Sequence, residues 1–220
     1  MHGERIPVQI LMMQMIPNLT VELSRALGLK SQDRAVGLIS TDSDDLTYIA
    51  LDEATKSANV RVVYGKSLYA GAANASTPYA GEVIGVLAGP TPAEVHSGLE
   101  AAKAFLQGAV GFQKTGNVAS SVYLSHCVSR TGTYLSAMAG VPVGEPLAYL
   151  VAPPVEAIVG LDAAIKSADV SLAAFFSPPT ETNFAGGLLH GSQSACQSAC
   201  EAFAQAVAKA AANPLITGEH

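Results

Sequence analysis

Hydrophobic positions along the chain follow two spacings in turn, and the alternation predicts strands interleaved with helices. Continuous apolar runs of strand length lie at 36–40, 61–65 and 80–89. Apolar residues spaced three and four apart predict amphipathic helices at 44–57 and 92–107. Helices and strands that alternate in this way indicate an α+β fold with several strands in one sheet.

The same succession of elements returns in the second half of the chain. Apolar runs predict strands at 147–151, 171–176 and 185–191, and helical spacing predicts helices at 155–167 and 192–212. The chain therefore repeats one pattern twice.

An internal sequence match supports this duplication. LDEATKSANV at 51–60 and LDAAIKSADV at 161–170 agree at seven of ten positions and lie 110 residues apart, half the length of 220. A prefix at 8–27 and another at 122–141 each predict a strand and a short helix, giving the order β-α-β-α-β-β-α in each half. We expect two domains, 1–110 and 111–220, joined through the polar stretch at 108–121.

Composition excludes several classes of partner. The net charge is -6 and no run rich in Lys or Arg occurs, so neither nucleic acid nor an anionic membrane is an expected partner. No apolar run approaches the roughly 20 residues that span a bilayer, and the first 17 residues lack a signal-peptide cleavage site. Charged residues make up only 14% of the chain, against about 25% in ordinary soluble domains, which is typical of a surface partly covered by partners.

Candidate chemistry is sparse. The three cysteines form an odd set without a CxxC motif, which favours a reducing, cytosolic location. His126 and Cys127 are adjacent on a predicted strand and point to opposite faces, whereas Cys196 and Cys200 share a helix face and are expected to pack in the core. No hydrolytic triad, nucleotide loop, metal motif or cofactor motif occurs, so we expect neither an enzyme nor a bound cofactor or metal.

Two carboxylates attract attention. The stretch TDSDD at 41–45 begins a helix, where capping and the helix dipole account for Asp42 and Asp44 but not for Asp45. Glu82 interrupts an apolar strand, so it lies either at a solvated edge or in a groove that holds a cation or a donor. The sequence leaves both interpretations of Glu82 open.

Two loops rich in small residues, at 65–78 and 177–183, follow the predicted strands at 61–65 and 171–176. The first is about 14 residues long, where compact domains commonly use about 4 to 6, which is typical of lids, binding loops or gates. A disordered loop without a role is the alternative.

Several blocks of sequence, in order, carry a family resemblance. STDSDDLTYIALDEATKSANVRVVYGKSLYAGAANAS, AGEVIGVLAGPTPAEV, SHCVSRTGTYLS, AYLVAPPVEA and PPTETNF with GSQSAC resemble shell proteins of ethanolamine-utilisation microcompartments of the EutL type. The resemblance implies two tandem, circularly permuted bacterial microcompartment (BMC) domains, each a ferredoxin-like α/β sandwich. It also implies a pseudo-hexameric homotrimer, a flat tile that packs edge to edge with other shell proteins in a cytoplasmic microcompartment.

The resemblance also assigns two sets of functional residues. In a small pore within each subunit, ethanolamine would be held by Asp45, Glu82 and the carbonyl of Phe112. A central pore would be gated by two loops, whose residues are Gly65, Lys66, Ser67, Leu68, Tyr69, Ala70, Gly71, Thr180, Glu181, Thr182, Asn183 and Phe184.

Two alternatives stay open. The chain is also compatible with a shell protein of another microcompartment, of the propanediol or ethanol type, in which Asp45 and Glu82 serve a different solute. From a different class, a small-molecule sensor or an enzyme would use the cleft between these two carboxylates.

Overall fold

The structure is a computed structural model, and it describes residues 4–68, 82–115, 121–178, 180, 182 and 184–215. Five of the expected gate residues lie outside these ranges: Tyr69, Ala70, Gly71, Glu181 and Asn183.

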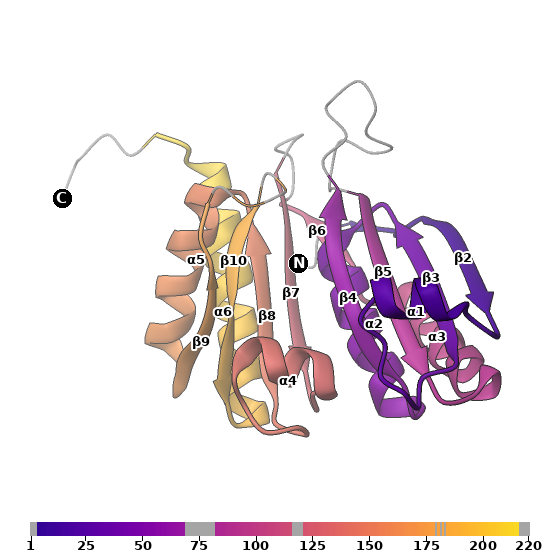
Figure 1. Ribbon diagram of the computed structural model, residues 1–220. Helices are drawn as coiled ribbons and strands as arrows, with labels where there is room; N and C mark the ends of the chain where they lie inside the picture. Colours follow the sequence, from indigo (N-terminus) through magenta and orange to yellow (C-terminus); the bar gives the residue numbers. More distant parts are fainter. Residues whose placement is uncertain are drawn as a thin grey trace.

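Each half of the chain folds in the predicted order of strands and helices (Figure 1). The first half contains β2 (Ile10–Ile16), α1 (Val21–Ala26), β3 (Ala35–Thr41), α2 (Asp44–Ser57), β4 (Arg61–Leu68), β5 (Glu82–Gly89) and α3 (Pro92–Leu106). The second half contains β7 (Val122–Val128), α4 (Thr133–Ala139), β8 (Leu147–Ala152), α5 (Pro154–Ser167), β9 (Val170–Phe176), β10 (Ala185–Gly191) and α6 (Gln193–Ala212). The predicted α+β repeat is confirmed.

The two sheets share one topology. The first is ordered β2-β3-β5-β4, and the second contains the same order as β7-β8-β10-β9, with antiparallel pairing throughout. Even an irregularity is repeated, because the register slips by one residue between Val62 and Tyr64 of β4 and between Leu172 and Ala174 of β9. The duplication therefore reaches the detail of backbone pairing.

Two short strands extend the second sheet to six and were not predicted from the sequence. They are β1 (Arg5–Ile6) and β6 (Phe112–Lys114), which pair with each other while β6 also pairs with β7. The Arg5 guanidinium donates to the carbonyls of Gly108 and Val110. The N-terminal segment of the chain is thus attached to the sheet of the second half.

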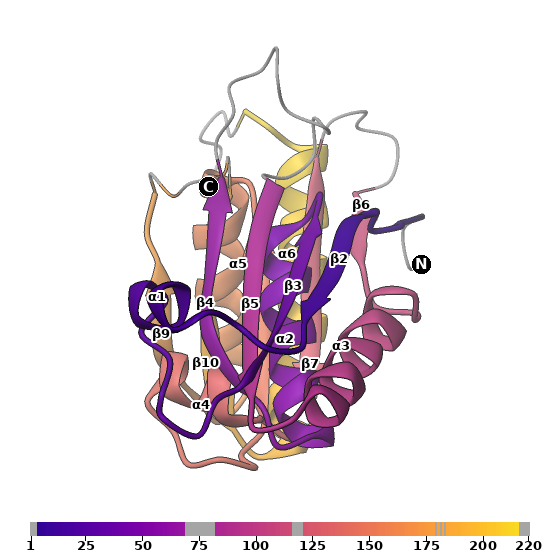
Figure 2. The same cartoon turned by 45° about the vertical axis from the view of Figure 1, so that its right-hand side comes forward.

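The layers alternate between sheets and helices. One hydrophobic cluster joins α2 and α3 to the inner face of the first sheet and, on their other side, to one face of the second sheet. The opposite face of the second sheet packs against α5 and α6 in a separate cluster. Figure 2 shows the first sheet in front, α2 behind it and α5 and α6 farther back, while α1 crosses the outer face of the first sheet.

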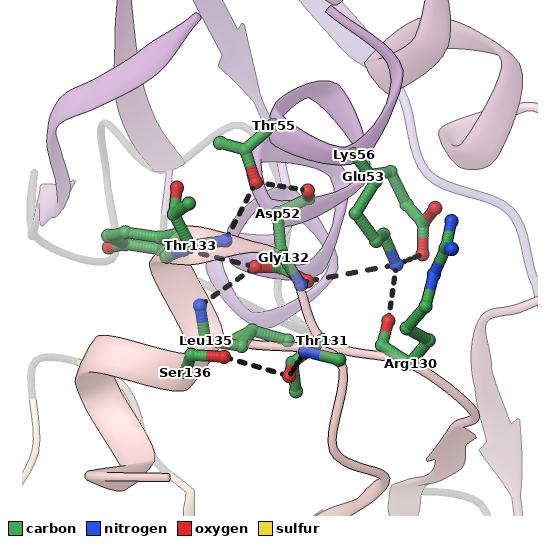
Figure 3. A network of polar contacts seen from close by, with 12 residues as sticks. Asp52, Glu53, Thr55, Lys56, Arg130, Thr131, Gly132, Thr133, Leu135 and Ser136 are labelled. Carbon is green, nitrogen blue, oxygen red and sulfur yellow. Dashed lines mark hydrogen bonds and ion pairs between the residues drawn. The ribbon is translucent and has the colours of Figure 1, made fainter. Parts of the chain in front are cut away.

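A buried carboxylate of the first half caps a helix of the second half (Figure 3). Asp52 on α2 has no exposed surface, and its Oδ1 accepts hydrogen bonds from the N–H groups of Tyr134 and Leu135 at 3.1 and 2.9 Å. Its Oδ2 accepts from the N–H of Gly132 at 2.7 Å. Gly132 is the N-cap residue of α4 and has no side chain to do this, so α2 provides the acceptor that the helix start needs.

Neighbouring groups complete this joint between the halves. The hydroxyl oxygen of Thr55 accepts from the N–H of Thr133 at 3.0 Å, and the Lys56 ammonium donates to the carbonyl of Arg130 at 3.0 Å. A Cβ atom at Gly132 would lie 2.2 Å from the Thr55 hydroxyl oxygen, so this close approach requires glycine.

We expect Asp52→Asn to lower the free energy of unfolding by about 2–4 kcal/mol, because an amide cannot accept all three hydrogen bonds and leaves a buried donor unsatisfied. The control is Glu100→Gln on α3, where the exposed carboxylate pairs with Lys103. That change is expected to stay within about 0.5 kcal/mol. Urea denaturation of both variants measures the difference, and equal effects would show that the cap does not stabilise the joint.

Candidate small-molecule site

A cavity of about 290 Å³ lies where the two halves meet, beside the start of α2. The first half contributes mainly polar groups to its wall, and the second half contributes mainly aromatic and aliphatic ones. The lining residues are Asp44, Asp45, Tyr48, Ser67, Met138, Tyr149, Val151, Phe176, Ser177, Thr180, Thr182, Phe184 and Ala185.

The turn before α2 fixes where the two carboxylates lie. Ser43 is the N-cap residue, and its carbonyl accepts hydrogen bonds from the hydroxyls of Thr41 and Thr47 at 2.9 and 2.8 Å. The Thr41 hydroxyl oxygen in turn accepts from the N–H of Ser43 at 3.0 Å. This buried network holds Asp44 and Asp45 in the first turn of the helix, where its dipole favours negative charge.

Asp42 does not take part in this capping, contrary to the expectation from the sequence that it caps the helix. Its carboxylate accepts from the N–H of Gln9 at 2.9 Å and joins the turn to the segment before β2. Asp44 is in the first turn, as the dipole argument requires, and its carboxylate accepts from the Ser67 hydroxyl at 2.5 Å and from the N–H of Asp45 at 2.9 Å.

Asp45 reaches across to the second half. Its Oδ1 accepts a hydrogen bond from the Tyr149 hydroxyl on β8 at 2.8 Å, and only 7% of the residue is exposed. No donor of the described residues reaches its Oδ2, and none of the ion pairs in that part of the chain includes it. One oxygen of a buried carboxylate is therefore left for a ligand in the cavity.

Burial dominates the electrostatics of the site. It raises the pKa of Asp45 well above the ordinary carboxyl value, and the nearby Asp44 raises this pKa further, while the hydrogen bond from Tyr149 acts in the opposite direction. Burial also raises the pKa of Tyr149 and Tyr48, so both phenols stay neutral.

Aromatic rings close the other side of the cavity. The Tyr149 ring lies 5.8 Å from that of Phe176 on β9. Phe184 lines the cavity and stacks at 5.2 Å on Phe112, so the ring of Phe112 supports the wall from behind. The cavity thus combines an acidic end with an apolar, aromatic one.

The three residues predicted to bind ethanolamine lie in different places in the structure. Asp45 lines the cavity. Phe112 begins β6, and its buried ring belongs to the hydrophobic core that the two halves share. Glu82 begins β5, opposite Leu68 in the ladder, and its side chain lies outside the described residues.

The first predicted loop begins later than expected. Gly65, Lys66, Ser67 and Leu68 belong to β4, whose ladder with β5 runs on to Glu82. Gly65 belongs to the strand and not to a loop, and its lack of a side chain makes room for two rings, because a Cβ atom would lie 3.0 Å from the Tyr134 hydroxyl and 3.1 Å from the Tyr48 ring.

The second predicted loop contributes directly to the cavity. Thr180, Thr182 and Phe184 all line it, and the Thr180 hydroxyl donates to the carbonyl of Phe184 at 2.8 Å. Ser67 of β4 lines it too. Ser67, Thr180, Thr182 and Phe184, which the resemblance assigns to a separate central pore, therefore line one cavity with Asp45, and no local sequence pattern indicates this.

His126 and the three cysteines pack against the hydrophobic core, as expected. His126 faces Phe105 of α3 at 5.9 Å, and burial, aided by the nearby Lys56, lowers its pKa to about 4. Cys196 and Cys200 pack in the core between the second sheet and α6, and Cys127 lies against this core. In the part of the chain that the structure describes, no cluster of three or more His, Cys, Asp or Glu side chains could hold a metal ion.

Similarity to known proteins identifies the family of the chain. The BMC domain family matches residues 35–123. The microcompartment shell protein EutL of Clostridium perfringens is 57% identical over 98% of this chain and 99% of its own, and EutL of Escherichia coli K12 is 52% identical over 92% and 93%. The chain belongs to the EutL family of bacterial microcompartment shell proteins.

Solved structures agree with this assignment. The crystal structure of the ethanolamine utilization protein EutL from Leptotrichia buccalis superposes with a TM-score of 0.92 at 57% identity and covers 98% of this chain and 99% of its own. The chain is thus a structural shell protein and not an enzyme, which excludes the catalytic interpretation of the cavity. Within the described residues, no helix has the length and apolar character that crossing a membrane requires.

We expect Asp45→Asn to stabilise the protein near neutral pH. Well below the ordinary carboxyl pKa, Asp45 is protonated in both the folded and the unfolded chain and costs nothing. As the pH rises, the unfolded chain ionises first and the folded chain only at its raised pKa, so the wild type loses stability over that interval. Over this pH interval, the wild type loses about 1.4 kcal/mol of unfolding free energy per pH unit.

Thermal unfolding between about pH 4 and about pH 8 measures this effect. The advantage of the variant should vanish at the acid end and grow towards neutral pH. A difference between the two proteins that is the same at every pH would contradict the burial of an ionisable carboxyl group.

Proposed function

We propose that the cavity binds a small organic ammonium ion, with ethanolamine as the ligand. The observation that carries this proposal is the carboxylate of Asp45: the residue is buried and lines a cavity of about 290 Å³, and no donor among the described residues reaches its Oδ2 atom. A buried carboxylate is costly unless a cation or donors compensate it. An ammonium group provides both the charge and three N–H donors.

The rest of the cavity fits a ligand with a short carbon chain and a hydroxyl group. Phe176 and Phe184 offer apolar surface to the carbon atoms, and the hydroxyls of Thr180 and Tyr48 offer polar partners. We place Glu82 as a second carboxylate and the carbonyl of Phe112 as an acceptor, on the resemblance alone. Neutral diols or alcohols, the solutes of the alternative microcompartments, have no charge with which to form an ion pair with an ionised Asp45.

Asp45→Asn is expected to weaken ethanolamine binding about tenfold or more, because a charge-assisted hydrogen bond is lost. Glu82→Gln is expected to weaken it several-fold. Glu100→Gln, which removes an exposed carboxylate of α3 that does not line the cavity, is the control and should bind as the wild type does. Isothermal titration calorimetry measures all three, and an unchanged affinity of the Asp45 variant would reject the site.

We also propose that each chain holds two BMC domains, 1–110 and 111–220. The matched segment 35–123 starts at β3 and ends in β7, so it crosses this boundary. Such an offset is expected when a strand and a short helix have moved from the end of the domain to its front, which is the meaning of circular permutation.

The internal joint supports a proposal for the assembly. Within the chain, α2 and α3 pack on one face of the second sheet, beside α4. Among the described residues, the corresponding face of the first sheet packs against Leu19 and Leu29, which flank α1, while Met12 of β2 and Val21 of α1 stay 57% and 66% exposed. The corresponding helix, α5, presents an apolar row that is between 39% and 72% exposed: Val155, Ile158, Val159 and Ile165.

These two exposed surfaces are related to each other as the two sides of the internal joint are. We place α5 of one copy on the outer face of the first sheet of the next, beside its α1. A head-to-tail contact gives a ring when its rotation closes and an open filament when it does not; we propose a closed homotrimer, which would contain six similar half-chain units. The low proportion of charged residues, 14%, is typical of this covered surface and of edge contacts with other shell proteins.

Ile158→Glu is expected to dissociate the trimer, because it places a charge in the proposed contact, where the wild-type side chain is 52% exposed in the single chain. Leu215→Glu, 82% exposed and beyond α6, is the control and should stay trimeric. Light scattering coupled to gel filtration should give a mass roughly threefold lower for the first variant only. A trimeric Ile158→Glu protein would remove α5 from the interface.

A central pore at the axis of this ring, gated by the segments after β4 and β9, is the remaining part of the proposal. Ser67 near the end of β4 and Thr180 and Thr182 between β9 and β10 support it, because they belong to or adjoin these segments and also line the Asp45 cavity.

A further inference from the structure

The chain contains two buried aspartates on one helix, and they differ in how their charge is compensated. Asp52 accepts three backbone N–H groups and lies 3.7 Å from the Lys56 ammonium. Asp45 accepts one phenolic O–H, and no cationic side chain of the described residues pairs with it. Within the described residues, only the dipole of α2 and the Tyr149 hydroxyl therefore compensate the charge of Asp45, so ionisation of this buried carboxylate favours a cation from solution.

A second carboxylate makes an uncompensated charge still less favourable. Asp44 is next to Asp45 and also lines the cavity, and both residues are at most 7% exposed. Two carboxylates in one dry site do not both ionise easily, so a proton is the natural occupant when no cation is present.

We propose that the cavity exchanges a proton for the organic cation: Asp45 is a neutral carboxylic acid when the cavity is empty and loses its proton to solvent when the ammonium ion enters. The balance is one cation bound and one proton released, while the nitrogen keeps its three hydrogens and no covalent bond changes. The exchange rests on the proposed ammonium site and specifies how that site is regulated. Entry of the ligand would be favoured at higher pH and opposed at lower pH.

The other groups around Asp45 do not take up this proton. On α2, Tyr48 faces the cavity, and on β8, Tyr149 donates to Asp45; burial raises the pKa of both phenols, so they keep their own protons. On α4, Tyr134 packs 6.3 Å from Tyr48 and its pKa is raised to about 12. Ser67 on β4, Phe176 on β9 and the threonines at 180 and 182 do not titrate, and the side chain of Glu82 on β5 lies outside the described residues.

Calorimetric titration with ethanolamine in phosphate and in MES buffer, neither of which contains a primary ammonium group, tests the exchange, because the difference in heat between the two buffers counts the protons released. We expect about one proton per ligand at the acid end of the range, with the affinity falling about tenfold per pH unit there, and no release at high pH. Ethylene glycol, with a hydroxyl in place of the ammonium, is the control ligand and should release no proton.

Two variants should move the pH midpoint of proton release in opposite directions. Asp44→Asn keeps an acceptor for Ser67 but removes the like charge, so the midpoint should fall. Tyr149→Phe removes the donor that stabilises the carboxylate, so the midpoint should rise. Circular dichroism verifies that both variants are folded.

The outcomes separate the two proposals. Absence of binding at every pH would overturn the ammonium site and the exchange with it. Binding with a constant affinity and equal heats in both buffers would leave the ammonium site intact and overturn the exchange. Midpoints that do not move, or that move in the same direction, would show that the proton is not on Asp45.

Discussion

The packing of α2 on α4 is the contact on which the geometry of the chain depends. A helix start leaves several N–H groups without partners, and α4 begins at a glycine that cannot provide an acceptor. Asp52 supplies this acceptor from the other half of the chain. Each half is therefore incomplete alone, because the start of α4 is satisfied only when α2 is docked against it.

The same helix carries the two carboxylates of the cavity. Asp45 precedes Asp52 by two turns of α2, so the docking that caps α4 also places Asp45 within hydrogen-bond distance of Tyr149. The cavity lies at a seam between two similar units, where the packing of side chains does not have to be complete. Duplication followed by divergence explains why one half supplies acidic groups and the other supplies aromatic ones.

The order of elements was predictable because each element carries a strong periodicity of its own and appears twice. The strands β1 and β6 were not, since two or three residues show no periodicity and their pairing joins residues more than 100 positions apart. Asp52 was equally hidden, because the repeat has an aspartate at Asp162 too and only docking distinguishes them. Asp45 could be singled out by its place in the helix start, but its partner Tyr149 lies in the other half, and no local pattern joins the two.

Stability and binding make opposite demands on the start of α2. Replacing the acidic pair by apolar residues would remove the cost of burying ionisable groups, and the corresponding position of the repeat, Val155, shows that this helix accepts such a residue. At Val155 the side chain is exposed in the single chain and suited to contact with another copy, whereas at Asp45 it is enclosed within the chain. The starts of the two copies of this helix have thus diverged. In our proposals, the start of α5 presents an apolar surface to a second protein chain, and the start of α2 lines a cavity for a small cation.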